Sequence, residues 1–311
     1  MMAVKMTIKK GRIERRVKND AGFSLVELMV AVTVMGIVTS QLLLSFSHQH
    51  TTSLEQERTV EIQQEARLIN DLILSDLRIG GFMVPAFAAV GSLDGGVNGS
   101  DILCVSDSTI INDNVLAAAT NKFPGATITA AIAGGASSVT VSAASMDIDS
   151  DGDDDFVIND GVLIGTGTEA HCAVITDIVG STISFTPSTV AGFSAAFNDV
   201  AVPALVYQVN GTTISRNSMI LSNHIEDLQV QFGVDADRNG TVEGAEFPID
   251  DLSGEEFELI ENVRITLTAR DQRGKPGFAG QFASVANRVA GAADNFKRRR
   301  MTGDTVLRNL Q

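Results

Sequence analysis

One acidic stretch of the chain has the spacing of a calcium-binding loop. Between residues 235 and 246, oxygen-bearing side chains recur at the positions that would surround one ion, and the sixth position is glycine. Calcium prefers about six to eight oxygen ligands, and this spacing lets one segment wrap around the ion. The candidate ligands are Asp235, Asp237, Asn239, Thr241 (through its backbone carbonyl), Glu243 and Glu246. A solvated acidic hairpin loop is the alternative, because an expected strand precedes the stretch where an EF-hand would have a helix.

A second acidic stretch repeats the beginning of this template. Its candidate ligands are Asp147, Asp149, Asp151 and Asp153. The twelfth position holds Ile158, so the glutamate that normally binds through both oxygens is missing. Neighbouring aspartates could replace it, and a charged turn is the equal alternative. Calcium is therefore the expected cofactor, with residues 235–246 as its main site.

Two cysteines, Cys104 and Cys172, are the only ones in the chain. They permit a single disulfide if the domain lies in an oxidising compartment. His171 precedes Cys172, but no acid is spaced to orient it as a catalytic base, and we expect it on the surface. Phosphate-binding loops, serine-hydrolase elbows and zinc-protease motifs are absent from the sequence, so no enzyme is expected.

The net charge of −15 is unevenly distributed. Residues 1–22 contain seven basic and two acidic residues, whereas the rest contains sixteen basic and thirty-six acidic ones. An apolar stretch, residues 23–46, follows the basic leader and is long enough to cross a bilayer as a helix. Basic residues before such a span place the N-terminus in the cytoplasm and the acidic bulk outside. The acidic bulk also argues against nucleic acid as a primary partner.

Glu27 is the only charged residue of the apolar stretch. A carboxylate inside a membrane span costs about 2.5–3.5 kcal/mol on insertion scales and needs a partner. Small residues precede the stretch, and no small-residue cleavage site follows it. Cleavage between Gly22 and Phe23 would create an amino group on Phe23, four positions before Glu27 or in a neighbouring molecule. An uncleaved signal anchor is the alternative, but it has no use for this carboxylate.

The basic leader followed by Gly22-Phe23-Ser-Leu-Val-Glu27-Leu resembles the class III leader of type IV prepilins. The resemblance implies cleavage by a prepilin peptidase between Gly22 and Phe23 and N-methylation of Phe23. It also implies that Glu27 docks the subunit during filament assembly. Pilins, minor pilins and the pseudopilins of type II secretion share this leader.

The rest of the chain resembles PilW-type minor pilins in the order and spacing of short segments. These segments are 71–82, 99–106, 160–178, 207–217, 224–235, 262–270 and 297–309. The chain departs from a major pilin in three ways: its cysteines do not bracket a short C-terminal loop, it has no proline before Pro85, and it is about twice as long as a compact pilin. These departures weigh against a bulk role in the filament.

A long helix is expected to lead into a β-rich domain. In the second half of the helix, an apolar stripe recurs at three- and four-residue steps and should pack on a sheet. The stripe consists of Ile62, Ala66, Ile69, Ile73 and Leu77. Gly80-Gly81 should end the helix. The expected organisation is leader 1–22, membrane or filament-core helix 23–46, amphipathic helix 47–80 and domain 81–311, with an insertion around 117–160.

Beyond residue 91 the pattern changes to short β-branched runs separated by turn residues, without alternating helices. This predicts an α+β fold with a mainly antiparallel, pilin-like sheet. The expected strands are 102–105, 126–132, 138–142, 162–164, 173–179, 182–186, 205–209, 212–216, 228–234, 258–269 and 305–308. The basic run Lys297–Arg300 is expected to be a solvated turn, or a contact for an acidic neighbour.

The function that follows is structural. The chain is expected to be a minor pilin that acts in assembly or initiation of a type IV pilus, near its tip. Its partners would be other minor and major pilins, the prepilin peptidase, the inner-membrane assembly platform and, before assembly, the membrane. It would begin as an inner-membrane precursor and later reach the periplasm, pilus or cell surface. The alternatives are a type II secretion pseudopilin and a membrane-anchored calcium-binding adhesin.

Overall fold

A computed structural model describes residues 24–82, 84–107, 125–143, 146–148, 152–166, 169–196, 199–250, 252 and 257–309. The chain divides into two compact units, residues 1–56 and 57–311. Helix α1 (Leu25–Ile79) supplies the described part of the first unit and continues into the second. Each unit is described by itself.

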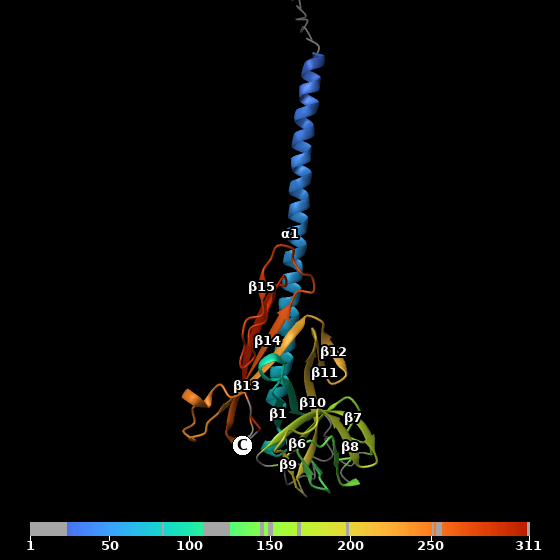
Figure 1. The fold of residues 1–311 in the computed structure, drawn as a ribbon, viewed down its shortest axis with the longest axis vertical. Coiled ribbons are helices and arrows are strands. Elements are labelled where there is room, and N and C mark those ends of the chain that lie inside the picture. Colours follow the sequence, from blue (N-terminus) through green and yellow to red (C-terminus); the bar gives the residue numbers. More distant parts are fainter. Residues whose placement is uncertain are drawn as a thin grey trace, which may run out of the picture. The chain divides into compact units, whose positions relative to one another are not determined.

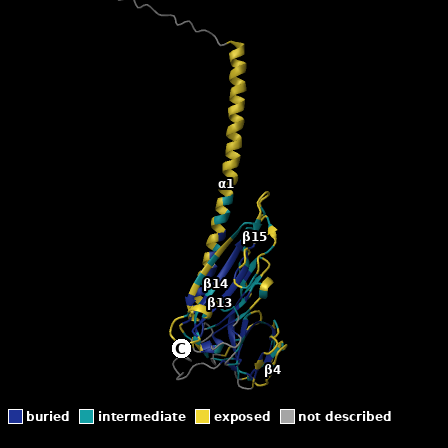
Figure 2. Ribbon diagram, turned by 60° about the vertical axis from the view of Figure 1, so that its left-hand side comes forward, coloured by how far each residue is buried: buried dark blue, intermediate teal, exposed yellow. Residues whose placement is uncertain are grey.

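In the first unit, the described residues form an exposed apolar helix. Every residue from Ser24 to Leu54 is exposed, including the large side chains of Leu25, Met35 and Phe46 (Figure 2). Among the described residues, α1 is the one helix long and apolar enough to cross a membrane. An apolar helix without intramolecular cover needs lipid or other helices around it.

The amphipathic half of α1 packs as the sequence predicts. All five members of the expected stripe are buried, together with Asn70 and Leu74. The helix ends at Ile79, and Gly81 adopts a positive φ of 81°. This is the left-handed conformation that terminates many helices, and glycine adopts it without steric cost. The glycine stop is therefore confirmed.

The second unit contains a ten-stranded antiparallel sheet (Figure 1). Its main order is β1-β2-β10-β6-β7-β8-β5, with β3 and β11 paired to β10 and β12 paired to β11. The strands are β1 (Val90–Leu93), β2 (Ile102–Ser106), β3 (Ala126–Thr127), β5 (Ser138–Thr140), β6 (Gly161–Gly165), β7 (Ala170–Val179), β8 (Thr182–Thr186), β10 (Val200–Asn210), β11 (Thr213–Arg216) and β12 (Met219–Ser222). Two tight turns with Gly180 and Gly211 at positive φ join β7 to β8 and β10 to β11.

A three-stranded antiparallel sheet shares a hydrophobic core with α1. It contains β13 (Ile225–Val234), β14 (Ile260–Arg270) and β17 (Arg298–Val306), in that order. Strand β17 runs beside α1 in the same direction, because Arg299 lines a groove with Arg67 while Thr305 accepts a hydrogen bond from Arg78 (3.1 Å). At Gly303 the two elements come so close that a Cβ atom would lie 2.3 Å from Asn70 Nδ2.

The remaining elements are small. Two-residue strands form the pairs β4 (Ile132–Ala133) with β9 (Ser194–Ala195) and β15 (Gly280–Gln281) with β16 (Ala293–Asp294). Short 3₁₀ turns are η1 (Ala86–Ala88), η2 (Gly96–Asn98), η5 (Gly244–Glu246) and η6 (Phe257–Leu259). The α+β class with an antiparallel sheet is thus confirmed.

Two expectations about strands are wrong. Residues 126–132 were expected to form one strand, but they contain the two-residue strand β3 and the first residue of β4. The basic run Lys297–Arg300 is not a turn, because Arg298–Arg300 begin β17. Pairing with β14 incorporates this segment into the sheet, and Arg298 is neutralised by Glu226 (2.7 Å) and by Asp294. Part of the expected insertion, residues 125–143, also supplies buried side chains to a second hydrophobic core.

Candidate functional site

The apolar half of α1 begins with a carboxylate. Glu27 lies in the first turn, and its Oε2 accepts a hydrogen bond from the backbone amide of Ser24 (3.1 Å). A negative charge is favourable there because the first turn of a helix has free N–H groups and the positive end of the helix dipole. Gly22 and Phe23 lie outside the described residues, so their geometry does not enter the site.

The structure brings together three predicted calcium ligands. Carboxylate oxygens of Asp235, Asp237 and Glu246 lie within 4.8 Å of one another. Asp235 is buried at the end of β13, whereas Asp237 and Glu246 are more exposed. Gly240, at the sixth position, has φ of 82° and allows the sharp turn that the loop requires. The chain therefore converges carboxylates at one point, as a hard cation would require.

The other predicted ligands are engaged within the loop. The side-chain oxygen of Asn239 accepts hydrogen bonds from the amide and hydroxyl of Thr241 (2.8 and 2.5 Å). Glu243 and Glu246 form a reciprocal capping box around η5. The Asp235 carboxylate accepts hydrogen bonds from the backbone amides of Asn239 (3.0 Å) and Gly240 (2.7 Å). These two bonds hold the first predicted ligand in place.

The second acidic loop is described only in part. Asp147 Oδ2 accepts the amide of Gly152 (3.0 Å), and Asp155 accepts the amide of Ile148. Asp153 is also described, whereas Asp149 and Asp151 lie outside the described residues. The described carboxylates thus accept hydrogen bonds from backbone amides across the loop. This arrangement fits a charged turn as well as a cation site.

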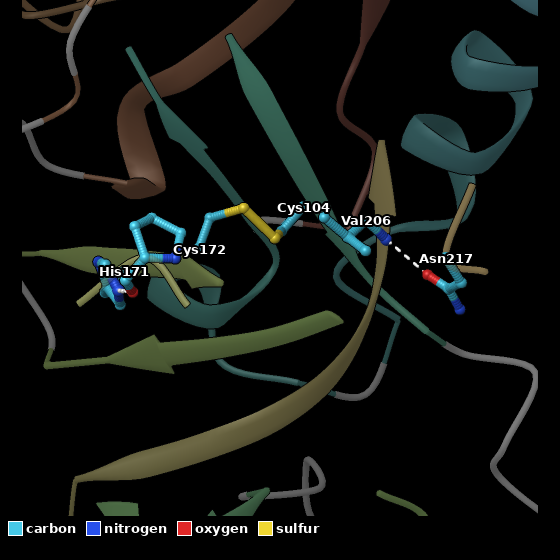
Figure 3. The surroundings of a disulfide bond; sticks show 6 residues. Cys104, His171, Cys172, Val206 and Asn217 are labelled. Atoms are coloured by element: carbon cyan, nitrogen blue, oxygen red, sulfur yellow. Dashed lines mark hydrogen bonds between the residues drawn. A yellow bond between two sulfur atoms is a disulfide. The ribbon is translucent and has the colours of Figure 1, made fainter. Parts of the chain in front are cut away.

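A disulfide joins the two cysteines across the large sheet. Cys104 on β2 and Cys172 on β7 are bonded, both are fully buried, and their Cα atoms lie 5.6 Å apart (Figure 3). His171, expected on the surface, is instead buried between Phe185 and Phe193, and its Nε2 lies 3.1 Å from the carbonyl oxygen of Pro187. Burial lowers the pKa of His171. With its neighbouring sulfur in a disulfide, the pair cannot act as a thiolate and base.

Two polar features were missed by the sequence reasoning. On α1, Asp76 accepts hydrogen bonds from the hydroxyl of Tyr207 and from Arg216 Nε (2.9 Å), which ties the helix to β10 and β11. A groove between α1 and β17 is lined partly by Arg67, Arg299 and Arg300. The basic run Lys297–Arg300 can be seen in the sequence. The sequence could not show that α1 lies beside this run and forms the other side of a groove.

Comparison with protein families gives two matches. Residues 192–309 match the model for Type IV Pilus-assembly protein W, and residues 17–40 match the model for the Prokaryotic N-terminal methylation motif. The first match covers β9 to β17, including the sheet that packs on α1, and the second covers the leader junction, Glu27 and the start of α1. No curated protein sequence and no solved structure matches the chain. The methylation motif, the long apolar helix and the matched C-terminal sheet support a type IV prepilin-like protein of the PilW type.

Proposed function

We propose that the chain is a minor pilin that acts in assembly or initiation of a type IV pilus, near its tip. The observation that carries the proposal is the exposed apolar start of α1 with one carboxylate, Glu27, in its first turn. The coarser part, a pilin-like structural protein whose precursor is anchored in a membrane, rests on the two family matches.

In the proposed mechanism, the apolar half of α1 exchanges lipid for the helices of neighbouring subunits. A prepilin peptidase cuts between Gly22 and Phe23, and the Phe23 amine is methylated. In the filament, Glu27 pairs with the Phe23 amine of a neighbour. Pairing of the two charges in a low-dielectric core compensates the cost of burying the carboxylate. It also selects the position of the subunit along the filament axis, because both charges must be satisfied there.

Replacing Glu27 by leucine tests this mechanism. The Glu27→Leu variant should still insert into the membrane and be cleaved, because leucine is favourable in lipid. Filaments should be lost, because the variant lacks the carboxylate that pairs with the neighbouring subunit. Filaments are counted by electron microscopy, and the N-terminus of the mature chain is sequenced. Met29→Leu is the matched control. It exchanges one apolar side chain for another, two residues further along the exposed helix, and the variant should assemble normally.

Two outcomes would contradict the proposal. If the chain still begins with Met1 in cells with an active prepilin peptidase, the uncleaved adhesin becomes the better explanation. If deletion of the gene leaves piliation intact but stops secretion of folded exoproteins, the chain is a secretion pseudopilin.

We also propose that the loop from Asp235 to Glu246 binds calcium. The convergent carboxylates of Asp235, Asp237 and Glu246 support this, and Asn239, Thr241 and Glu243 would complete the ligand set after small rearrangements within the loop. The ion would neutralise the carboxylates and fix the connection between β13 and β14. The loop from Asp147 to Asp153 is the second, weaker candidate.

Calcium titration of the full chain in detergent tests the second proposal. Free calcium at one hundred times its Kd should stabilise the fold by about 2.7 kcal/mol, seen as a rise in Tm. Asp235→Asn should abolish the rise, whereas Glu258→Gln, an exposed acid outside the loop, should keep it. If calorimetry shows that two ions bind, the loop at 147–153 is the second site. An unchanged Tm would refute calcium binding.

A further inference from the structure

The groove between α1 and β17 has the chemistry of a binding site for carboxylates. It has a volume of about 300 Å³ and is lined by Val60, Gln63, Gln64, Ala66, Arg67, Arg299, Arg300 and Met301. Three of the lining residues are arginines and none is acidic. Ala66 and Met301 are apolar, so the groove combines apolar contact with positive charge.

The arginines of the groove are available to a partner. Arg299 is exposed and makes no hydrogen bond or ion pair within the described part of the chain. Arg67 lies 4.0 Å from Asp71, and both side chains are largely exposed, which makes their ion pair weak. Arg300 donates to the carbonyl oxygens of Ala283 and Ser284 (3.1 and 3.0 Å), which positions its guanidinium beside the groove.

The surrounding protein makes this basic groove unusual. Eight of the sixteen basic residues between 23 and 311 fall within residues 270–300, where only two acids occur. By contrast, residues 235–261 contain ten acids and one arginine. Guanidinium groups pair with carboxylates through two parallel hydrogen bonds, so an acidic protein segment is complementary to the groove. The segment 235–261 is an acidic stretch of this kind in the sequence of the chain itself.

The face of α1 beside the groove also lacks cover. Leu68 is 71% exposed and Val60 is 49% exposed, although both belong to the half of the helix that packs on the sheet. Along α1 they continue the series of exposed apolar residues that begins at Leu25. Exposed apolar side chains next to exposed arginines are typical of a protein interface, in which apolar contact and charge pairing act together.

We propose that the α1–β17 groove binds an acidic segment of a neighbouring pilin subunit. The inference rests on the proposed assembly function and adds the surface and the chemistry of the partner. Arg299 and Arg67 pair with carboxylates of the neighbour, while Val60 and Leu68 cover its apolar residues. Attachment of the same arginines to anionic lipid is the competing outcome.

Photo-crosslinking in piliated cells tests the inference with the full chain. A photoreactive amino acid, p-benzoylphenylalanine, replaces Gln64 inside the groove, and the product is identified by mass spectrometry. We expect a crosslink to another pilin subunit. Arg299→Glu places a like charge against the partner and should lower its yield by about tenfold. Arg308→Glu, an equal charge change at an exposed position two residues beyond the end of β17, is the matched control and should leave the yield unchanged.

A crosslink to phospholipid, a crosslink to no pilin, or a yield that Arg299→Glu leaves unchanged would each overturn the inference. Normal amounts of the variant in the membrane fraction, and an unchanged Tm, show that it has folded. The proposed function is judged separately. If Glu27→Leu abolishes filaments while the Arg299→Glu crosslink persists, the groove inference fails and the pilin function stands.

Discussion

At the scale of single residues, the second unit contains two buried carboxyl groups with raised pKa values. Asp101 is 2% exposed, and its two carboxylate oxygens accept the amides of Gly95 (3.0 Å) and Val230 (2.8 Å). Burial raises its pKa from 3.8 to about 7, against the opposing effect of these two amides, and the negative charges of Asp94 and Asp227 add to the rise. Burial also raises the pKa of Asp227, although Arg288 pairs with it.

The raised pKa of Asp101 predicts a pH dependence of stability. Between about pH 4 and pH 7 the folded chain binds more protons than the unfolded one, so the free energy of unfolding should fall as the pH rises. The slope from this group should be on the order of 1 kcal/mol per pH unit. Urea unfolding at pH 4.5, 5.5 and 6.5 measures it, and Asp101→Asn should flatten the curve. An equal slope in both proteins would contradict the prediction.

At the scale of elements, the contact between α1 and β17 depends on one glycine. A Cβ atom at Gly303 would lie 2.3 Å from Asn70 Nδ2 and 2.7 Å from Leu74 Cδ1, and Leu74 belongs to the hydrophobic core. Gly303→Ala should therefore force the strand from the helix and lower the free energy of unfolding by about 1–3 kcal/mol. Urea denaturation measures this. Val306→Thr, at an exposed position of the same strand, should change it by less than about 0.5 kcal/mol.

The same pair of elements shows what the sequence could and could not predict. The stripe from Ile62 to Leu77 and the pair Gly80-Gly81 are local patterns, so they predicted the buried face of α1 and its end. The start of β17 was read as a turn because its charges suggested solvent. Its neutralising partner Glu226 lies 72 residues away, and such a non-local pair leaves no trace in local spacing. The loop at 235–246 was found because its ligands lie in one continuous segment, whereas the groove needs two segments that only the fold brings together.

At the scale of the whole molecule, charge and apolar surface are separated along the chain. The methylation motif overlaps the end of the cationic leader and the start of the exposed apolar helix, and the basic groove lies within an otherwise acidic domain. A domain with unlike charged surfaces can bind its neighbours head to tail, which is the type of contact that builds open filaments. The domain is also cross-linked covalently by its disulfide.

The disulfide between Cys104 and Cys172 connects strands β2 and β7, which are separated by β10 and β6 in the large sheet. It closes a loop with a sequence separation of 68 residues, and its loss should cost about 2–5 kcal/mol, chiefly because the unfolded chain regains freedom. The double variant Cys104→Ala/Cys172→Ala should show this loss in urea unfolding, and reduction of the native chain should produce a similar one. Because the cysteines lie in the ten-stranded sheet and β17 in the three-stranded sheet, the Gln64 crosslink should survive at temperatures where the variant remains folded. Loss of the crosslink under those conditions would show that the disulfide also positions the interface.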